Sequence, residues 1–483
     1  MSLVEREPKR PTARKIETMT ETELTADYVI VGSGAVGMAF ADTLMTESDA
    51  TLIIIDRYAK PGGHWNVAYP FVQLHQPSSF YGVNSKELGA GRLEVGGLND
   101  GLGELSSGAE VLAYYDDIMR HQFLPSGRVD YYPMCDYLGD GKFISKTNGK
   151  SYRVKATRKF VDATHLNTSV PSTHTPNFEI APDVTFMPLN DLPKLQGSAE
   201  GYVVIGAGKT GIDACLWLLD QRVDPEDITW IMSRDSWFIN RRNAQTDMSF
   251  FFDTMGAAAN EFESIAQADS PEDMFDRLEA TGYFLRLDPD VRPSMFHGAT
   301  ISHAELEQLQ RIKNVVRLGR VSSLGLNEIV LEKGRIPTTP KTVHIDCSAS
   351  ALKDTLENKP VFQGDHITPQ MVRPYQPVFS AAMIAHVELN YETEAEKNKI
   401  CGVVPLPDKD VDYMRFTLAA LLNQNTWREY SDLGKWMMEN RLSGPGRMLR
   451  LIAPEDEEKR AVIQRIRENA PLAAMKLMQF LET

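Results

Sequence analysis

The chain has very little cysteine. Only four of its 483 residues are cysteines, and no two of them form a CxxC or comparable pair: Cys135, Cys215, Cys347 and Cys401. Such isolated cysteines exclude a disulfide framework, a zinc ribbon and a redox dithiol, and they are typical of a reducing compartment. We therefore expect neither disulfides nor a metal site.

Positive charge and long apolar runs are also scarce. The chain has 51 Lys and Arg against 66 Asp and Glu, which gives a formal net charge of −15. An acidic protein is repelled by nucleic acid and by anionic membranes. No charge-free apolar run is long enough to span a bilayer, and the polar N-terminal segment lacks the apolar core of a signal peptide. We expect a cytoplasmic protein with a disordered tail over 1–24 and no nucleic-acid or membrane partner.

One local pattern occurs twice in the chain. The stretches "DYVIVGSGAVGMAFADTL" (27–44) and "YVVIGAGKTGIDACLWLL" (202–219) each contain an apolar strand, three glycines and the start of a helix. This is the strand, glycine turn and helix of a mononucleotide-binding unit. Because 483 residues also exceed what one hydrophobic core usually serves, the repeat predicts two dinucleotide-binding domains.

The first unit has the features of a dinucleotide site. Gly32 permits the tight turn after the strand, Gly34 lets backbone N–H groups approach a pyrophosphate, and Gly37 allows the helix to pack closely on the strand. The N-terminus of the helix then faces the anion. Asp56 ends the next strand, where a carboxylate accepts hydrogen bonds from ribose hydroxyls. The alternative is a glycine-rich turn in an ordinary α/β core.

The second unit differs at the end of its second strand. Its turn uses Gly206, Gly208 and Gly211, but the next strand is followed by Ser233 and Arg234 instead of an acid. A guanidinium and a hydroxyl suit the dianionic 2′-phosphate of NADPH, which a carboxylate would repel. We therefore predict FAD in the first unit and NADPH in the second, with hydride passing from nicotinamide to flavin.

Two alternatives remain for the second unit. Asp235 follows Arg234 directly and could bind a ribose diol if the strand ends one residue later. Arg234 could equally be a solvated surface charge.

Three further segments resemble the class B flavin monooxygenases, which include microsomal-type flavin monooxygenases, N-hydroxylases and Baeyer–Villiger enzymes. The segment "DRYAKPGGHW" (56–65) is similar to the acid and Gly-Gly-x-Trp motif of the class that lines FAD. The segment "FYGVNSKEL" (80–88) is similar to its Asn-containing loop at the flavin, and "SRDSWFINR" (233–241) to its NADPH-binding Ser-x-Arg, Trp and Arg.

The resemblance implies specific contacts. It places Asn84 beside the isoalloxazine as the catalytic residue, and it implies FAD contacts from Asp56, Arg57, Gly62, Gly63 and Trp65. For these residues simpler roles stay open: a turn for the glycine pair, a core aromatic for Trp65, and a helix N-cap for Asn84.

A second contact with the flavin is expected from the C-terminal part of the chain. The segment "RPYQPVFSAAMIAHVE" (373–388) predicts a helix beginning near Phe379 or Ser380, whose N-terminus would face the pyrimidine edge of the flavin. This assigns Gln376 and Ser380 to the flavin site. An interior amphipathic helix with an ordinary cap is the alternative.

The sequence departs from the class at other motifs. The FxGxxxH fingerprint before the second glycine turn is absent, and the two Ala-Thr-Gly linkers are replaced by "VDATH" (161–165) and "IDCSAS" (345–350). These motifs are associated with domain positioning and NADPH handling, so their loss bears on oxygenation more than on cofactor binding. No equivalent of the catalytic arginine of Baeyer–Villiger enzymes stands out.

The sequence thus predicts an α/β fold of two Rossmann-like domains with an inserted helical lobe. We expect a discontinuous FAD domain over 25–195 and 345–483, which includes a helical C-terminal region, and an NADPH domain over 196–344 with helices inserted at about 243–300. The predicted activity is an NADPH-dependent monooxygenase that uses a C4a-peroxyflavin and O₂ on a small organic substrate. The alternatives are a flavin dehydrogenase or oxidase without oxygen transfer, and a non-catalytic or redox-sensing cofactor-binding protein.

Overall fold

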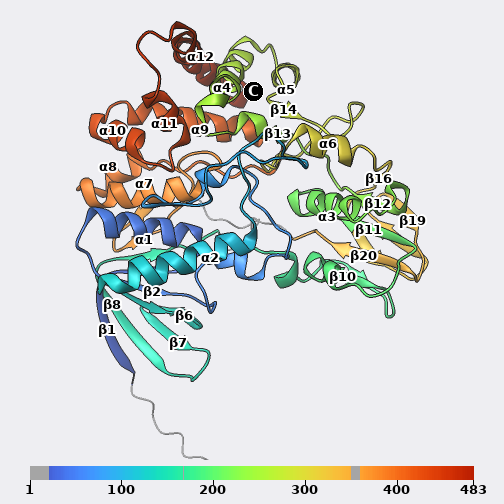
Figure 1. The fold of residues 1–483 in the computed structure, drawn as a ribbon, viewed down its shortest axis with the longest axis horizontal. Coiled ribbons are helices and arrows are strands. Elements are labelled where there is room, and N and C mark those ends of the chain that lie inside the picture. The colour runs from blue at the N-terminus through green and yellow to red at the C-terminus, as the bar shows by residue number, and fades with distance from the viewer. Residues whose placement is uncertain (1–20, 167, 350–358, 483) are drawn as a thin grey trace, which may run out of the picture.

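The computed structural model describes residues 21–482 except 167 and 350–358, and it contains one large mixed sheet and one parallel sheet (Figure 1). The first sheet has the order β21-β22-β8-β1-β2-β5, and the antiparallel strands β6 and β7 extend it from β8. Its strands are β1 (Thr22–Val31), β2 (Leu52–Ile55), β5 (Val129–Tyr132), β6 (Cys135–Gly139), β7 (Lys142–Ser145), β8 (Ser151–Asp162), β21 (Phe362–Gln363) and β22 (His366–Ile367).

Helices α1 (Ala35–Glu47), α2 (Gly108–Ile118) and α7 (Pro377–Asn390) accompany the first sheet, and α1 packs on both β1 and α7 (Figure 1). The eight consecutive residues 37–44 of α1 are all buried. A helix that is buried on every side needs small and apolar residues all round, and "GMAFADTL" supplies most of them. All four residues of β2, "LIII", are likewise buried, as in a parallel strand covered on both faces.

The second sheet is parallel throughout and has the order β10-β20-β11-β12-β16. Helices α3 (Lys209–Asp220) and α6 (His303–Leu309) lie with it, and α3 packs on β11. Its strands are β10 (Phe186–Pro188), β11 (Gly201–Ile205), β12 (Ile228–Ile231), β16 (Asn314–Val316) and β20 (Thr342–Asp346). A smaller sheet beside it contains β9 (Glu179–Ile180), β17 (Val321–Leu324), β18 (Glu328–Leu331) and β19 (Gly334–Pro337).

The two sheets, each with parallel central strands and a glycine turn between one of these strands and a helix, confirm the predicted α/β class. Two strands of the second sheet extend beyond the predicted NADPH domain of residues 196–344. Strand β10 precedes residue 196 and β20 spans residue 345, but both pair in the second sheet. The predicted tail over 1–24 also ends too late, since Thr22 already pairs with Tyr152 in β8. Residues 1–20 lie outside the described part of the chain.

A helical lobe stands at the end of the molecule away from β1 (Figure 1). It combines the inserted helices α4 (Phe251–Gln267) and α5 (Pro271–Ala280) with α12 (Glu457–Glu482), which packs against both α4 and α9. The small sheet of β13 (Phe238–Asn240), β14 (Phe284–Leu285) and β15 (Thr300–Ile301) lies beside them. Between the lobe and α7 run α8 (Glu394–Ile400), α9 (Asp412–Trp427), α10 (Ser431–Glu439) and α11 (Gly444–Arg450).

Candidate functional site

Two positions of the first glycine turn require glycine. Gly32 has φ = +98°, in the left-handed region that side chains disfavour. A Cβ on Gly37 would lie 1.9 Å from the Gly32 carbonyl oxygen, so α1 could not approach β1 this closely with any other residue. Gly34 is the N-cap of α1, and the helix has neither a side-chain cap nor an acid in its first turn. Its first N–H groups are therefore available to an anion.

The predicted glycine pair of the flavin loop lies directly against this turn. The Gly62 N–H donates to the Ser33 carbonyl oxygen over 2.8 Å, and a Cβ built on Gly63 would lie 2.9 Å from Gly34 Cα. The two segments thus pack backbone against backbone at the N-terminus of α1. Trp65 follows as a core aromatic that is 8% exposed, and its Nε1 donates to the Tyr81 hydroxyl over 2.8 Å.

Asp56 also lies at this turn, but its carboxylate already has partners within the protein. Its Oδ2 accepts from the Ser33 N–H and hydroxyl over 2.5 and 2.8 Å, and its Oδ1 accepts from the Tyr58 N–H over 2.7 Å. A carboxylate has about four acceptor positions, so one remains for a ribose hydroxyl. Arg57, the next residue, is exposed.

The second glycine turn repeats the geometry of the first. Gly206 has φ = +138°, and a Cβ on Gly211 would lie 2.2 Å from the Gly206 carbonyl oxygen. Gly208, the N-cap of α3, is different: its φ is −84°, and a Cβ there would meet no atom of the described residues within 4 Å. Gly206 and Gly211 are thus required by the fold, whereas Gly208 borders open space at an uncapped helix N-terminus. That is the expected environment for a glycine that a phosphate approaches.

The two altered linkers form the same turn. At the end of β8, the Asp162 carboxylate accepts from the N–H and hydroxyl of Thr164 over 3.0 and 2.6 Å. At the end of β20, the Asp346 carboxylate accepts from the N–H and hydroxyl of Ser348 over 2.9 and 2.6 Å. An Asp-x-Ser/Thr turn therefore stands where the class has Ala-Thr-Gly.

Each linker also lies against a glycine turn. A Cβ on Gly32 would lie 2.8 Å from Thr164 Cγ2, and one on Gly206 would lie 2.3 Å from the Cys347 carbonyl oxygen. The changed linkers thus pack closely on both turns, through the Thr164 side chain at Gly32 and through the Cys347 backbone at Gly206.

Ser233 and Arg234 follow β12, as the sequence predicts, and Ser233 is exposed. Arg234 makes a bidentate ion pair with Asp408, with N–O distances of 2.9 and 2.7 Å, and His297 Nε2 lies 2.8 Å from the same carboxylate. Hydrogen bonding from Arg234 holds the pKa of Asp408 well below its usual range. The guanidinium expected to bind a 2′-phosphate thus lies beside a carboxylate from the segment before α9.

Asp235, the alternative residue for binding the ribose diol, pairs with a different arginine. Its two oxygens accept from Arg317 Nε and Nη2 over 2.8 and 2.9 Å, and the residue is 8% exposed. Asp235 is therefore held in a bidentate ion pair with Arg317 within the protein.

Arg241, which the resemblance placed among the NADPH-binding residues, is fully buried. It pairs with Glu305 at 2.8 Å and donates to the carbonyl oxygens of His75 and Thr300 over 3.0 and 3.1 Å. These contacts connect the loop at His75 to β15 and α6. Arg241 therefore fixes the position of these segments.

Replacing this buried arginine is expected to destabilise the protein. Arg241→Met leaves Glu305 buried without its cation, which typically costs about 3–5 kcal/mol. Arg242→Met is the matched control, because the neighbouring Arg242–Asp253 pair is exposed and such pairs contribute about 0–1 kcal/mol. Denaturant unfolding followed by circular dichroism checks both values. Equal losses for the two variants would contradict the structural role of Arg241.

Asn84 lies in the turn of a hairpin formed by β3 (Gly82–Val83) and β4 (Lys86–Glu87). The alternative of a helix N-cap is therefore wrong, because a strand follows the residue. Asn84 Oδ1 accepts the Arg441 N–H over 2.8 Å, and the Arg441 guanidinium donates to the carbonyl oxygens of Ser79, Tyr81 and Val83.

Gln376 is the N-cap of α7, which begins at Pro377, slightly earlier than predicted. Ser380 is fully buried, and its hydroxyl accepts from the Val372 and Arg373 N–H groups over 3.2 and 3.3 Å. Arg373 Nη1 in turn donates to Gln376 Oε1 over 3.4 Å. Ser380 therefore shapes the segment before the helix, and Gln376 lies closer to any ligand at the helix N-terminus.

One C-terminal segment contacts Asn84 and also a neighbour of Gln376. Arg441 contacts Asn84, while two residues further on the Ser443 hydroxyl accepts from Arg373, the partner of Gln376, over 2.9 Å. Sequence reasoning missed Arg373 and Arg441. Neither lies in a recognisable motif, and Arg441 acts on a loop more than 300 residues away along the chain.

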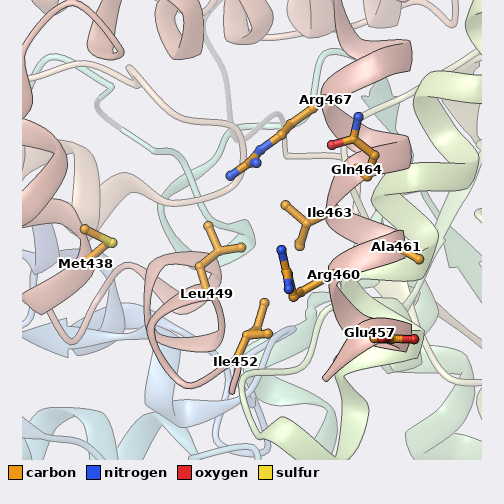
Figure 2. Close-up of a pocket in the computed structure, with 9 residues that line it drawn as sticks. All are labelled: Met438, Leu449, Ile452, Glu457, Arg460, Ala461, Ile463, Gln464 and Arg467. Carbon is orange, nitrogen blue, oxygen red and sulfur yellow. The ribbon is translucent and has the colours of Figure 1, made fainter. Parts of the chain in front are cut away.

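A surface groove of about 580 Å³ lies apart from these residues, between α10–α11 and α12 (Figure 2). Arg460 and Arg467 project from α12 into it, toward Leu449 and Ile452 (Figure 2). None of the predicted cofactor residues lines it. Within the described residues, no helix has the length and apolarity needed to cross a membrane, and no group of His, Cys, Asp and Glu could hold a metal ion.

Comparison with known proteins identifies relatives and a fold. No protein-family model matches the chain. The uncharacterized proteins Rv2000 of Mycobacterium tuberculosis and Mb2023 of Mycobacterium bovis are each 46% identical to it over 478 residues, which cover 98% of this chain and 86% of theirs. The ε-caprolactone-bound structure of cyclohexanone monooxygenase aligns at 15% identity and a TM-score of 0.50, covering 85% of this chain and 98% of that one. The chain therefore belongs to the family of these mycobacterial proteins and has the fold of a class B flavin monooxygenase.

Proposed function

We propose that the protein is an FAD-containing, NADPH-dependent oxidoreductase, and that it acts as a monooxygenase on a small organic molecule. The observation that carries the proposal is the pair of glycine turns, each at an uncapped helix N-terminus but followed by different residues. Asp56 stands after β2, whereas Ser233 and Arg234 stand after β12. Two such sites with opposite charge suit two different dinucleotides.

The residues of the first site fit FAD. The backbone surface made by Gly34 and Gly63 would accept the pyrophosphate, with the free N–H groups of α1 directed at it. The remaining acceptor position on Asp56 would take a ribose hydroxyl. Asn84 and Gln376, which the C-terminal segment links through Arg441, Ser443 and Arg373, would both lie at the flavin ring. Bound FAD would supply hydride acceptance and, once reduced, reaction with O₂.

The residues of the second site fit NADPH. The open space at Gly208 and the uncapped N-terminus of α3 would accept its pyrophosphate. Arg234 would bind the 2′-phosphate after exchanging its present partner, Asp408, for the phosphate.

A flavin dehydrogenase or oxidase is the second candidate, because the FxGxxxH fingerprint is missing from the chain. The two activities differ in the fate of O₂. We expect NADPH oxidation by the FAD-loaded protein to consume O₂ and to yield oxygenated product in preference to H₂O₂ when a substrate is present. An oxygen electrode, a peroxide assay and mass spectrometry of a panel of amines, sulfides and ketones test this. Stoichiometric H₂O₂ with every compound would support the oxidase instead.

A further inference from the structure

A single acidic side chain lies in an aromatic cluster inside the helical lobe. Glu261 projects from α4, and its Oε1 accepts the Tyr413 hydroxyl over 2.6 Å. Rings surround this pair: the centroids of Tyr283, Phe284 and Phe296 lie 6.5, 5.1 and 5.3 Å from that of Tyr413. The cluster therefore combines one carboxylate with several ring faces.

The carboxylate has no cation beside it among the residues that the structure describes. Cations on the elements around it are paired with other acids: Arg465 with Glu263, Arg286 with Glu279, Arg277 with Asp273 and Arg415 with Asp412. The titratable groups that face Glu261 are the hydroxyls of Tyr283 and Tyr413, with Tyr375 near them. A buried carboxylate without a cation is costly to ionise.

Burial has the expected effect on this acid. Desolvation raises the pKa of Glu261 to about 7, although hydrogen bonds from Tyr413 and Tyr283 oppose the rise. Glu261 and Tyr283 are nevertheless partly accessible, whereas Tyr413 is fully buried. The acid is therefore not sealed inside the core.

Two more polar groups of the same cluster lack partners within the described part of the chain. The Tyr375 hydroxyl and Trp237 Nε1 are buried, and neither has a hydrogen-bond partner among these residues. Tyr375 also has φ = +59°, which is unfavourable for a residue with a side chain. Buried polar groups are normally satisfied, and strained residues often occur where a ligand binds. Tyr375 directly precedes Gln376, so the cluster extends to the proposed flavin edge.

From this arrangement we infer that the cluster around Glu261 binds a small organic ammonium ion. The ammonium N–H donates to the Glu261 carboxylate, and the alkyl groups lie against Tyr283 and Tyr375, the partly accessible tyrosines of the cluster. A cation over aromatic rings gains about 0.5–2 kcal/mol, and it also provides the positive charge that the buried carboxylate lacks. Alkylated amines fit best, because the walls are aromatic and offer few acceptors.

The ligand site depends on residues of the lobe and not on a bound flavin. It therefore goes beyond the proposed function and can be tested without it. If the flavin chemistry also holds, the bound ion competes with the substrate, or it becomes the substrate once its nitrogen has lost the N–H proton.

Calorimetric titration of the full-length protein, with and without FAD, tests the site. The probe is N,N-dimethylbenzylamine, and benzyl methyl ether is its neutral analogue. We expect the amine to bind better than the ether by about tenfold or more, and Glu261→Gln to remove that preference. Glu263→Gln is the matched control, because Glu263 lies on the same helix but pairs with the partly exposed Arg465. It should bind the amine like the unmodified protein.

The pH dependence gives a second readout. The amine stays protonated between about pH 6 and 8, while Glu261 ionises, so its affinity should rise roughly tenfold over this range. The affinity of the Glu261→Gln variant for the amine should not change over this pH range. Tyr413→Phe keeps the ring but removes a hydrogen bond to the carboxylate, so the rise should move to higher pH.

Several results would overturn the site. These are the absence of amine binding, equal binding of amine and ether, or an unchanged preference in Glu261→Gln. Flavin content and NADPH oxidation are recorded on the same samples, so failure of the proposed function would appear separately.

Discussion

The Gly208→Ala variant is expected to bind NADPH about 10- to 100-fold more weakly, because a methyl group forced into a close contact costs about 1–3 kcal/mol. The contact arises only with the ligand. Gly208 has an ordinary φ of −84°, and its Cβ would meet no protein atom within 4 Å. The loss of stability should therefore stay below about 1 kcal/mol, the cost of a poorer N-cap. Fluorescence titration with NADPH and thermal unfolding measure the two effects.

Two other glycines serve as controls. In Gly256→Ala, within α4, the new Cβ also meets no atom of the described residues within 4 Å. This variant should bind NADPH normally and gain about 0.5–1 kcal/mol in stability, because alanine favours a helix more than glycine does. Gly211→Ala should unfold at a distinctly lower temperature, because its Cβ would lie 2.2 Å from the Gly206 carbonyl oxygen. The proposed pyrophosphate site is wrong if Gly208→Ala binds NADPH normally, or if it is destabilised as much as Gly211→Ala.

The Arg234→Ala variant is expected to lose about 10- to 100-fold in affinity for NADPH and little for NADH. A hydrogen bond to a charged group contributes about 1.5–3 kcal/mol, and only NADPH carries the 2′-phosphate. Arg335→Ala is a suitable control, because Arg335 forms an exposed ion pair with Glu328 beside the second sheet. Equal losses for NADPH and NADH would contradict the assignment of Arg234.

Asp408→Asn should have the opposite effect. Asp408 now takes both terminal nitrogens of Arg234, so the phosphate must compete with this carboxylate. Exposed pairs contribute about 0.2–1 kcal/mol, and removal of this one should tighten NADPH binding by about two- to fivefold. NADH should bind as before. Weaker NADPH binding in Asp408→Asn would mean that the carboxylate orients Arg234 and does not compete for it.

The local parts of the site could be predicted from the sequence. A glycine turn is encoded within six residues, and the close contact of Gly37 with Gly32 or of Gly211 with Gly206 follows from that spacing. The buried strand β2 and helix α1 likewise follow from continuous apolar patterns. The positions of Asp56 and Arg234 could also be predicted, because each residue lies just after the end of a recognisable strand.

The contacts between distant segments could not be predicted. Arg234 and Asp408 lie far apart in the sequence, and nothing in "VPLPDKD" marks the acid as a partner. The Asn84 hairpin depends on Gly82, with φ = +92°, and on Tyr114, whose hydroxyl accepts the Val83 N–H. "NSKEL" alone reads equally well as a helix start, which explains the incorrect N-cap alternative.

The transfer of electrons from NADPH to FAD is the central claim, and anaerobic reduction tests it most directly. The purified protein is incubated with FAD, freed of excess cofactor, and mixed with NADPH or NADH without oxygen while the visible absorbance of the flavin is followed. We expect one FAD per chain, and we expect its absorbance to bleach at a much lower concentration of NADPH than of NADH. A protein that retains no FAD, or whose flavin stays oxidised in saturating NADPH, would contradict the account.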